Sequence, residues 1–336
     1  GLDVVIERVG PADAVAQRLP GTGGVQVVVQ PRRVVVTGMG IACPLGLGVE
    51  RRVEELVERG GIDPEHRLLV RDQALALKTR LLCDSGVDLN QADTLRDGLD
   101  QLLHHPYQSF QPVLSFLRAA AADPAVVGIK QTIYRTGEDS ELMNILLSAA
   151  RAGKEVTVVV ELMARFDEEA NINWASKLER VGAHVVYGVV GQKTHAKMVM
   201  VVRREKTETG KVILRRYVHL GTGNYHPKTA RLYTDFGLFS CDESLGHDVH
   251  EVFNHLTGLG RARKLNKIWN SPFNLHSNVV IAVRKEAELA KAGKKCRIMA
   301  RMNALLEPNL INELYAASQA GVKIDLIVRG VCALRP

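Results

Sequence analysis

A histidine and a lysine stand two residues apart, as His195 and Lys197, where the alternating apolar run of KTHAKMVMVVRRE begins. Residues i and i+2 of a β-strand project from one face, so the spacing predicts that both side chains lie together at the start of a strand. A neutral imidazole can attack phosphorus, and a neighbouring ammonium attracts the anion and neutralises developing charge. The pair therefore indicates phosphoryl chemistry, although a surface histidine beside a solvated lysine would have the same spacing.

A turn of small residues follows about 25 positions later, in HLGTGNYHPKTARLYTD. Its residues Gly221, Thr222, Gly223 and Asn224 would let phosphate oxygens approach backbone N–H groups. H-x-K followed at this distance by G-[ST]-x-N resembles the pattern of the phospholipase D-like superfamily, whose phosphohistidine chemistry uses two duplicated halves. Val202 occupies the position where that pattern has an aspartate, and this departure points away from ordinary phosphodiesterases.

Regular alternation of strands and helices must position these residues. The patterns predict strands over 125–135, 154–165, 183–190, 194–204 and 212–220, and helices over 138–153 and 166–182. The helix over 138–153 has Asp139 or Ser140 near its N-cap and Gly153 as its stop. The nearly all-apolar run 154–165 is typical of a parallel strand covered on both faces. The sequence therefore predicts an α/β layered fold.

Part of the chain repeats itself. Residues 140–162 align without a gap over residues 308–330, with identical residues at seven positions. Helix-to-strand units share apolar spacing and a glycine stop by chance, but the identity of Asn144 and Asn312 is not required by a core. We favour a true duplication. The counterpart of His195 in the second half would fall beyond Pro336.

The amino-acid composition indicates the cellular compartment of the protein and the charge of its binding partners. The formal net charge of +7 suits an anionic partner, which could be phosphate, nucleic acid or a membrane surface. The five cysteines are widely spaced and form no C-x-x-C pair, which indicates reduced thiols in a cytoplasmic protein. No apolar stretch approaches the roughly 20 residues that a membrane span needs, and no signal peptide is visible.

Residues 1–103 differ from the rest of the chain in their sequence pattern, and no domain is assigned to them. Residues 32–50 weakly resemble the opening strand and turn of β-ketoacyl synthases, but the cysteine and histidine contexts of those enzymes are absent downstream. The glycines of TGMGIACPLG match neither a P-loop nor a complete dinucleotide-binding motif, so they indicate a plain turn. A fused segment and a gene-assembly artefact are both compatible with this region.

From about residue 104 to residue 336 the sequence closely resembles the catalytic C-terminal half of polyphosphate kinases of the histidine-phosphorylated bacterial type. The matching stretches are HHPYQSF, IKQTIYRTGEDS, VTVVVELMARFDEEANINWA, KTHAKM, HLGTGNYHPKTARLYTDFGLF and LIVRGVCAL. The resemblance implies a phospholipase D-like duplicated α/β sandwich, with a first catalytic domain over 104–268 and a truncated second one over 269–336. It also implies reversible transfer of the terminal phosphate of ATP to polyphosphate through a phosphohistidine, with Mg²⁺.

The same resemblance assigns catalytic residues. His195 resembles the phosphorylated histidine, with Lys197 beside it. Arg135 and Arg165 match two arginines of the magnesium–phosphate site. A guanidinium cannot ligate a cation, so we interpret both as bidentate clamps on the phosphates that the metal bridges.

Two further residues match nucleotide or phosphate contacts in the family, Tyr233 and Arg329. Asn224, whose amide belongs to the G-[ST]-x-N turn, is a third candidate substrate contact, whereas the family's nucleotide-contacting asparagine is not recognisable in residues 1–103. Tyr233 could stack on a base or donate to phosphate, whereas by itself it would as readily be a half-buried strand aromatic. Because the family's second catalytic histidine would lie beyond Pro336, the activity of this chain alone is left open.

Other titratable residues are explained by structural roles as well as by functional ones. His247, His250 and His255 have helical spacing but form no i, i+4 pair with a positioned glutamate, so we expect packing or solvent-exposed roles. The acidic residues 167–169 open a helix, where they favour the helix dipole; a magnesium role competes equally.

Two rival functions remain at this point. The first is a phospholipase D-like phosphodiesterase or nuclease that uses the same histidine, and the second is a non-catalytic fragment that binds polyanions. For the favoured function the partners are ATP or ADP and polyphosphate, with no specific nucleic acid. Peripheral membrane association is left open, and the full-length family is expected to form homo-oligomers.

Overall fold

The computed structural model describes the backbone of five short strands within residues 3–42, and residues 100–336 apart from 135–139, 162–167, 189–193, 208 and 259–263. The five strands are β1 (Asp3–Arg8), β2 (Ala16–Pro20), β3 (Val27–Val29), β4 (Val35–Thr37) and β5 (Gly40–Ala42). Arg135 and Arg165 therefore lie outside the described residues, as does Asp167.

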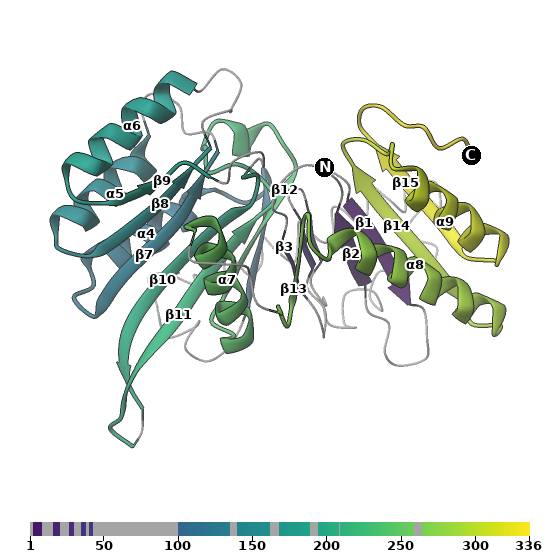
Figure 1. Ribbon diagram of the computed structural model, residues 1–336, viewed down its shortest axis with the longest axis horizontal. Helices are drawn as coiled ribbons and strands as arrows, with labels where there is room; N and C mark the ends of the chain where they lie inside the picture. Colours follow the sequence, from purple (N-terminus) through teal and green to yellow (C-terminus); the bar gives the residue numbers. More distant parts are fainter. Residues whose placement is uncertain are drawn as a thin grey trace, which may run out of the picture.

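A seven-stranded sheet forms the centre of the first half, in the order β6-β12-β11-β10-β7-β8-β9 (Figure 1). Its strands are β6 (Gln101–His105), β7 (Val126–Ile133), β8 (Glu155–Val160), β9 (His184–Val186), β10 (Lys197–Lys206), β11 (Val212–Gly221) and β12 (Asp235–Ser240). Strands β7, β8 and β9 pair in parallel, and the remaining pairs are antiparallel.

Helices cover both faces of this sheet. α4 (Gln111–Ala122), α5 (Glu141–Arg151) and α6 (Glu168–Arg180) lie on one face, and α7 (Glu243–Leu256) lies on the other (Figure 1). The predicted local signals are confirmed in α5, where the Ser140 side chain accepts the Met143 N–H and Gly153 follows the helix with a φ of 82°. Strand β8 is buried after its first residue, as the predicted two-sided cover requires.

The second half repeats the unit that organises the first. Here α8 (Leu275–Lys291), β14 (Cys296–Met302), α9 (Pro308–Gln319) and β15 (Lys323–Val328) follow the same order as α4, β7, α5 and β8. Strands β14 and β15 pair in parallel, as β7 and β8 do. The predicted duplicated α/β architecture is therefore confirmed. On its other edge β14 pairs with β1, and β13 (Ile268–Asn270) pairs with β3.

A buried carboxylate fixes the segment that joins the two halves. Asp248 of α7 has no exposed surface, and its oxygens accept the backbone N–H groups of Asn266, Lys267 and Ile268 at 2.5–3.0 Å. One side chain of α7 therefore holds the backbone just before β13 and at its first residue.

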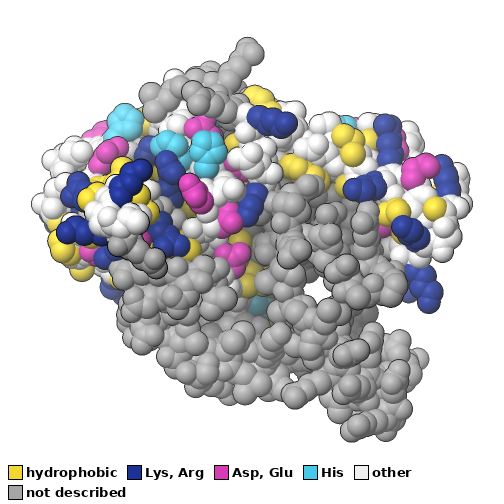
Figure 2. All heavy atoms as spheres, turned by 90° about the horizontal axis from the view of Figure 1, so that it is seen from below, with side chains coloured by type: hydrophobic (Ala, Val, Ile, Leu, Met, Phe, Trp, Pro, Cys, Tyr) yellow, Lys and Arg dark blue, Asp and Glu magenta, His cyan; other side chains and the backbone are white. Residues whose placement is uncertain are grey.

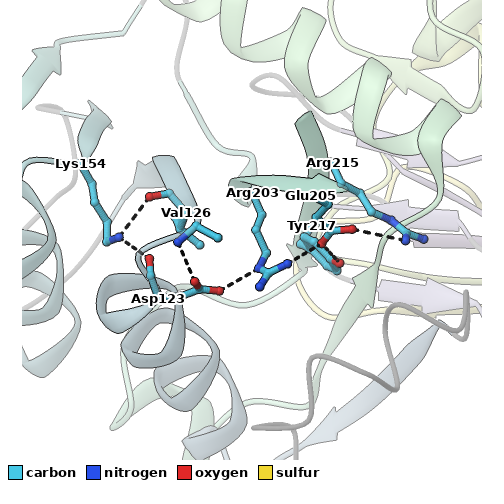
Figure 3. Close-up of polar contacts among 8 residues, drawn as sticks. Asp123, Val126, Lys154, Arg203, Glu205, Arg215 and Tyr217 are labelled. Carbon is cyan, nitrogen blue, oxygen red and sulfur yellow. Dashed lines mark hydrogen bonds and ion pairs between the residues drawn. The ribbon is translucent and has the colours of Figure 1, made fainter. Parts of the chain in front are cut away.

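Charged side chains brace the end of β10 and β11 that lies away from His195 (Figure 3). Arg203 donates to Asp123 at 2.8 Å and to Glu205 at 3.1 Å, and Glu205 also accepts the Tyr217 hydroxyl at 2.6 Å. Arg215 lies 3.7 Å from Glu205. These pairs bridge α4, β10 and β11, so they stabilise the base of the long hairpin.

Basic side chains are spread over the described parts of both halves on the face drawn in Figure 2, with histidines beside basic and acidic side chains on the first half. Within the residues that the structure describes, no helix is long and apolar enough to cross a bilayer; the longest, α8, has 17 residues.

Candidate active site

His195 lies just before the first residue of β10, where a buried carboxylate holds the backbone. The Thr194 N–H donates to Glu161 Oε2 at 2.6 Å, and both residues are buried. Glu161 directly follows β8, and its own N–H donates to the carbonyl of Ile133 at the end of β7. The ends of two parallel strands therefore fix the segment that carries the half-buried His195.

Lys197 and Tyr134 pack against His195. The Lys197 ammonium donates to the His195 carbonyl at 2.6 Å and lies 5.2 Å from the centre of the Tyr134 ring. The Tyr134 ring meets the His195 imidazole edge to face, with 5.0 Å between their centres. Lys197 is only 4% exposed, so its charge is held next to His195 instead of extending into solvent.

The glycine-rich turn is locked to β12 by one carboxylate. Thr222 donates its hydroxyl to Asp235 Oδ1 at 2.7 Å and accepts the Phe236 N–H at 3.0 Å. A β-carbon on Gly223 would lie 2.4 Å from Asp235 Oδ2, so only glycine fits there. The turn also reaches the lysine, because Gly221 stands opposite Lys197 in the register of β10 and β11.

A buried histidine contacts the tyrosine that follows the glycine-rich turn. His219 Nδ1 lies 2.8 Å from the Tyr225 hydroxyl, and the side chains of both residues are buried. Burial lowers the pKa of His219 to about 3, with a smaller contribution from the nearby His105, so the imidazole is neutral near pH 7. Burial likewise lowers the pKa of His105. The two rings add no positive charge to the region behind Lys197.

Tyr233 and Arg329 come together across the two halves. The guanidinium carbon of Arg329, which directly follows β15, lies 5.8 Å from the centre of the Tyr233 ring. Arg329 also donates to Asn303 Oδ1 at 2.9 Å. Tyr233 is half exposed, so one face of this pair is open to a ligand. The structure thus brings together two residues that the resemblance assigns to nucleotide and phosphate contacts.

Magnesium can be tested against the donor atoms of this region. Mg²⁺ prefers oxygen ligands and is commonly shared with substrate phosphates. Within the described part of the chain, no three His, Cys, Asp or Glu side chains are arranged to hold a metal. Asn224 Oδ1 is a buried oxygen that accepts no hydrogen bond in the structure. These residues fit a magnesium ion that is carried by phosphates and reached by few protein oxygens.

Sequence reasoning missed several residues of this region. Glu161 was hidden inside the apolar run VTVVVELMA, and Asp235 gave no signal beyond its place two residues after Tyr233 in RLYTD. Tyr134 stands beside a predicted site arginine, and that adjacency was the only signal for it. Of the other predicted histidines, His255 packs its ring against Phe273 at 5.0 Å between ring centres.

Family models and curated relatives both match this chain to polyphosphate kinases. The family model described as polyphosphate kinase C-terminal domain 1 matches residues 92–262, and the one described as C-terminal domain 2 matches residues 268–336. The polyphosphate kinase of Burkholderia ambifaria strain MC40-6 is 67% identical over 244 residues, which are 73% of this chain and 35% of that protein. That of Paraburkholderia phytofirmans is 70% identical over 237 residues, 70% of this chain and 34% of that protein.

A solved structure of a polyphosphate kinase also resembles this chain. The crystal structure of polyphosphate kinase from Porphyromonas gingivalis superimposes with a TM-score of 0.66 at 35% identity, over 74% of this chain and 38% of that chain. The chain therefore spans about a third of the length of the relatives that it matches.

Proposed function

Because this chain belongs to the polyphosphate kinase family over residues 92–336, we propose that it carries the phosphoryl-transfer site of an ATP–polyphosphate phosphotransferase. The observation that carries the proposal is the placement of His195. The backbone N–H of the preceding residue, Thr194, is held by Glu161, and the ring and carbonyl of His195 contact Tyr134 and Lys197.

The reaction would proceed in two displacements at one imidazole. A nitrogen of neutral His195 attacks the terminal phosphorus of ATP; a P–N bond forms, the P–O bond to ADP breaks, and ADP leaves with the electron pair. A terminal oxygen of polyphosphate then attacks the phosphohistidine, so that a P–O bond forms and the imidazole is released. Both steps are reversible, and the Lys197 ammonium stabilises charge on the transferring group.

Substrate binding would use residues from both halves. Arg329 and Tyr233 would hold the nucleotide and its phosphates, with Asn224 supplying an amide at the turn. Arg135 and Arg165 would clamp phosphate oxygens in bidentate fashion. Bound Mg²⁺ would supply neutralisation of the phosphate charge. The proposal also includes ATP or ADP and polyphosphate as partners, a homo-oligomeric assembly, and the cytoplasm, where free thiols such as those of Cys241 and Cys296 persist.

Labelling with ATP that carries radioactive phosphorus in its terminal phosphate tests the proposal. We expect the chain to gain an acid-labile, base-stable phosphate in the presence of Mg²⁺, and the His195→Ala variant to gain none. His184→Ala is the matched control, because His184 is exposed on β9, at the far edge of the sheet. An unlabelled wild-type chain, or a label that survives in His195→Ala, would contradict the proposal. Polyphosphate binding without any label would favour the polyanion-binding alternative.

A further inference from the structure

A second group of basic side chains lies on the α7 side of the sheet, beside the middle of β10. Lys130 of β7 stands opposite Met200 of β10, and Arg216 of β11 stands opposite Val202. Opposed residues and residues two apart share a face, so Lys130, Val202 and Arg216 all project toward α7. Their strands flank β10 on its two sides, which places Val202 between the two cations.

Helix α7 packs against this group of side chains. A β-carbon on Gly246 would lie 3.0 Å from the Arg216 β-carbon and 3.6 Å from its δ-carbon, so the helix rests directly on the arginine stem. His250 follows Gly246 by one helical turn and therefore lies on the same side of α7. Val202 packs against the apolar cluster around α7, so the surface between the two cations is apolar.

The two cations of this group form no ion pairs within the described residues. Neither Lys130 nor Arg216 has an ion pair with any carboxylate in the described part of the chain. His250 Nδ1 is buried and has no hydrogen-bond partner in the structure. The pKa of His250 is lowered by burial, then by Arg216 and Lys130, with His247 acting in the same direction and Glu251 opposing it. Two cations thus act electrostatically on an imidazole whose Nδ1 has no hydrogen-bond partner in the structure.

We propose that Lys130, Arg216 and His250 form a binding site for a phosphate group, separate from the site at His195. The ligand is either free orthophosphate or one unit of an oligophosphate chain, because two cations and an imidazole N–H match the charge and acceptors of both. Val202 is five strand residues from Lys197, about 17 Å along β10, so one phosphate group cannot occupy both sites.

Histidine NMR and calorimetry on the His195→Ala variant test the site, with orthophosphate and tripolyphosphate as separate probes at constant ionic strength. We expect saturable shifts of the His250 signals and a rise in the His250 pKa on binding, since an anion favours the imidazolium. Arg216→Gln and Lys130→Gln should each weaken the affinity about tenfold. Arg151→Gln, an exposed arginine at the end of α5 on the opposite face, should leave it unchanged.

The outcomes separate this site from the proposed enzyme activity. Saturation by both probes identifies free phosphate as sufficient, and saturation by tripolyphosphate alone identifies an oligophosphate. Unshifted His250 signals, or equal affinities in the wild-type and both glutamine variants, would overturn the proposal. Because His195 is absent from these samples, a failure of phosphohistidine labelling would leave this result unaffected.

Discussion

At the scale of single residues, the glycine of the candidate site with least room for a side chain is Gly223, which faces Asp235. The carboxylate lies where any side chain on Gly223 would begin, and the same carboxylate accepts the Thr222 hydroxyl. Asp235 is only 8% exposed, so it has little room to move away. The path of the turn therefore depends on the absence of one methyl group.

We predict that Gly223→Ala will displace the turn. The new β-carbon would meet Asp235 Oδ2 at 2.4 Å, so either the carboxylate leaves Thr222 or the backbone shifts. We expect a loss of about 1–3 kcal/mol in the free energy of unfolding in urea, together with slower labelling of His195. Gly210→Ala is a stringent control at the hairpin tip, where a positive φ of 77° also disfavours alanine but no phosphate site is near. It should cost stability without slowing the labelling; equal labelling rates in both variants would contradict the prediction.

The sequence predicted that His195 and Lys197 lie together, but not the groups that hold them. Their spacing predicts a shared strand face, whereas the glycine-rich turn and the family resemblance, not the spacing, indicated phosphoryl chemistry. Glu161 and Tyr134 reach them only through the pairing of β7, β8 and β10, and long-range pairing leaves no local signal. The contact of Arg329 with Tyr233 likewise joins residues from different halves. The roles of Arg135 and Arg165 stay predictions.

At the scale of elements, Asp248 of α7 controls how one half leads to the other. Its carboxylate accepts three successive backbone N–H groups in the segment before β13. No local pattern predicted this, because GHDVH reads as a polar helical stretch. By contrast, the internal repeat predicted the second half well: a shift of 168 positions carries the bounds of β8 onto those of β15.

We predict that Asp248→Ala will destabilise the junction by about 2–5 kcal/mol, because it leaves buried backbone donors without an acceptor. Asp248→Asn keeps one acceptor oxygen and should cost less. Urea unfolding measures both, with Glu243→Gln in the first, exposed turn of α7 as a control that should cost less than about 1 kcal/mol. A cost for Asp248→Ala no larger than that of the control would show that the junction is held in another way.

At the scale of the whole molecule, the buried histidines link stability to pH. His219 has a pKa of about 3 in the folded chain against an ordinary value of 6.5, so between these values the unfolded chain binds the extra proton. The free energy of unfolding therefore falls as the pH is lowered through this window. The slope from one such group is at most about 1.4 kcal/mol per pH unit. His105 adds to it in the same direction.

We predict that His219→Gln will flatten this dependence. Between pH 7 and pH 5 the variant should lose less of its free energy of unfolding than the wild-type chain, by up to about 1.4 kcal/mol per pH unit. The carboxylates of Asp123 and Asp242 have lowered pKa values and ordinary values of 3.8, so they act below this range. Urea unfolding at several pH values provides the comparison, with the exposed His184→Gln as a control. Parallel curves for His219→Gln and the wild type would contradict the assignment.

The contact between Arg329 and Tyr233 depends on how the two halves are positioned relative to each other. Each half supplies one partner, and neither partner is buried deeply enough to be held by its own core. Their alignment therefore depends on how the two halves are joined, and Asp248 holds the backbone where the second half begins. An inserted residue between α7 and β13 is expected to leave the core of each half intact and still move Arg329 away from Tyr233.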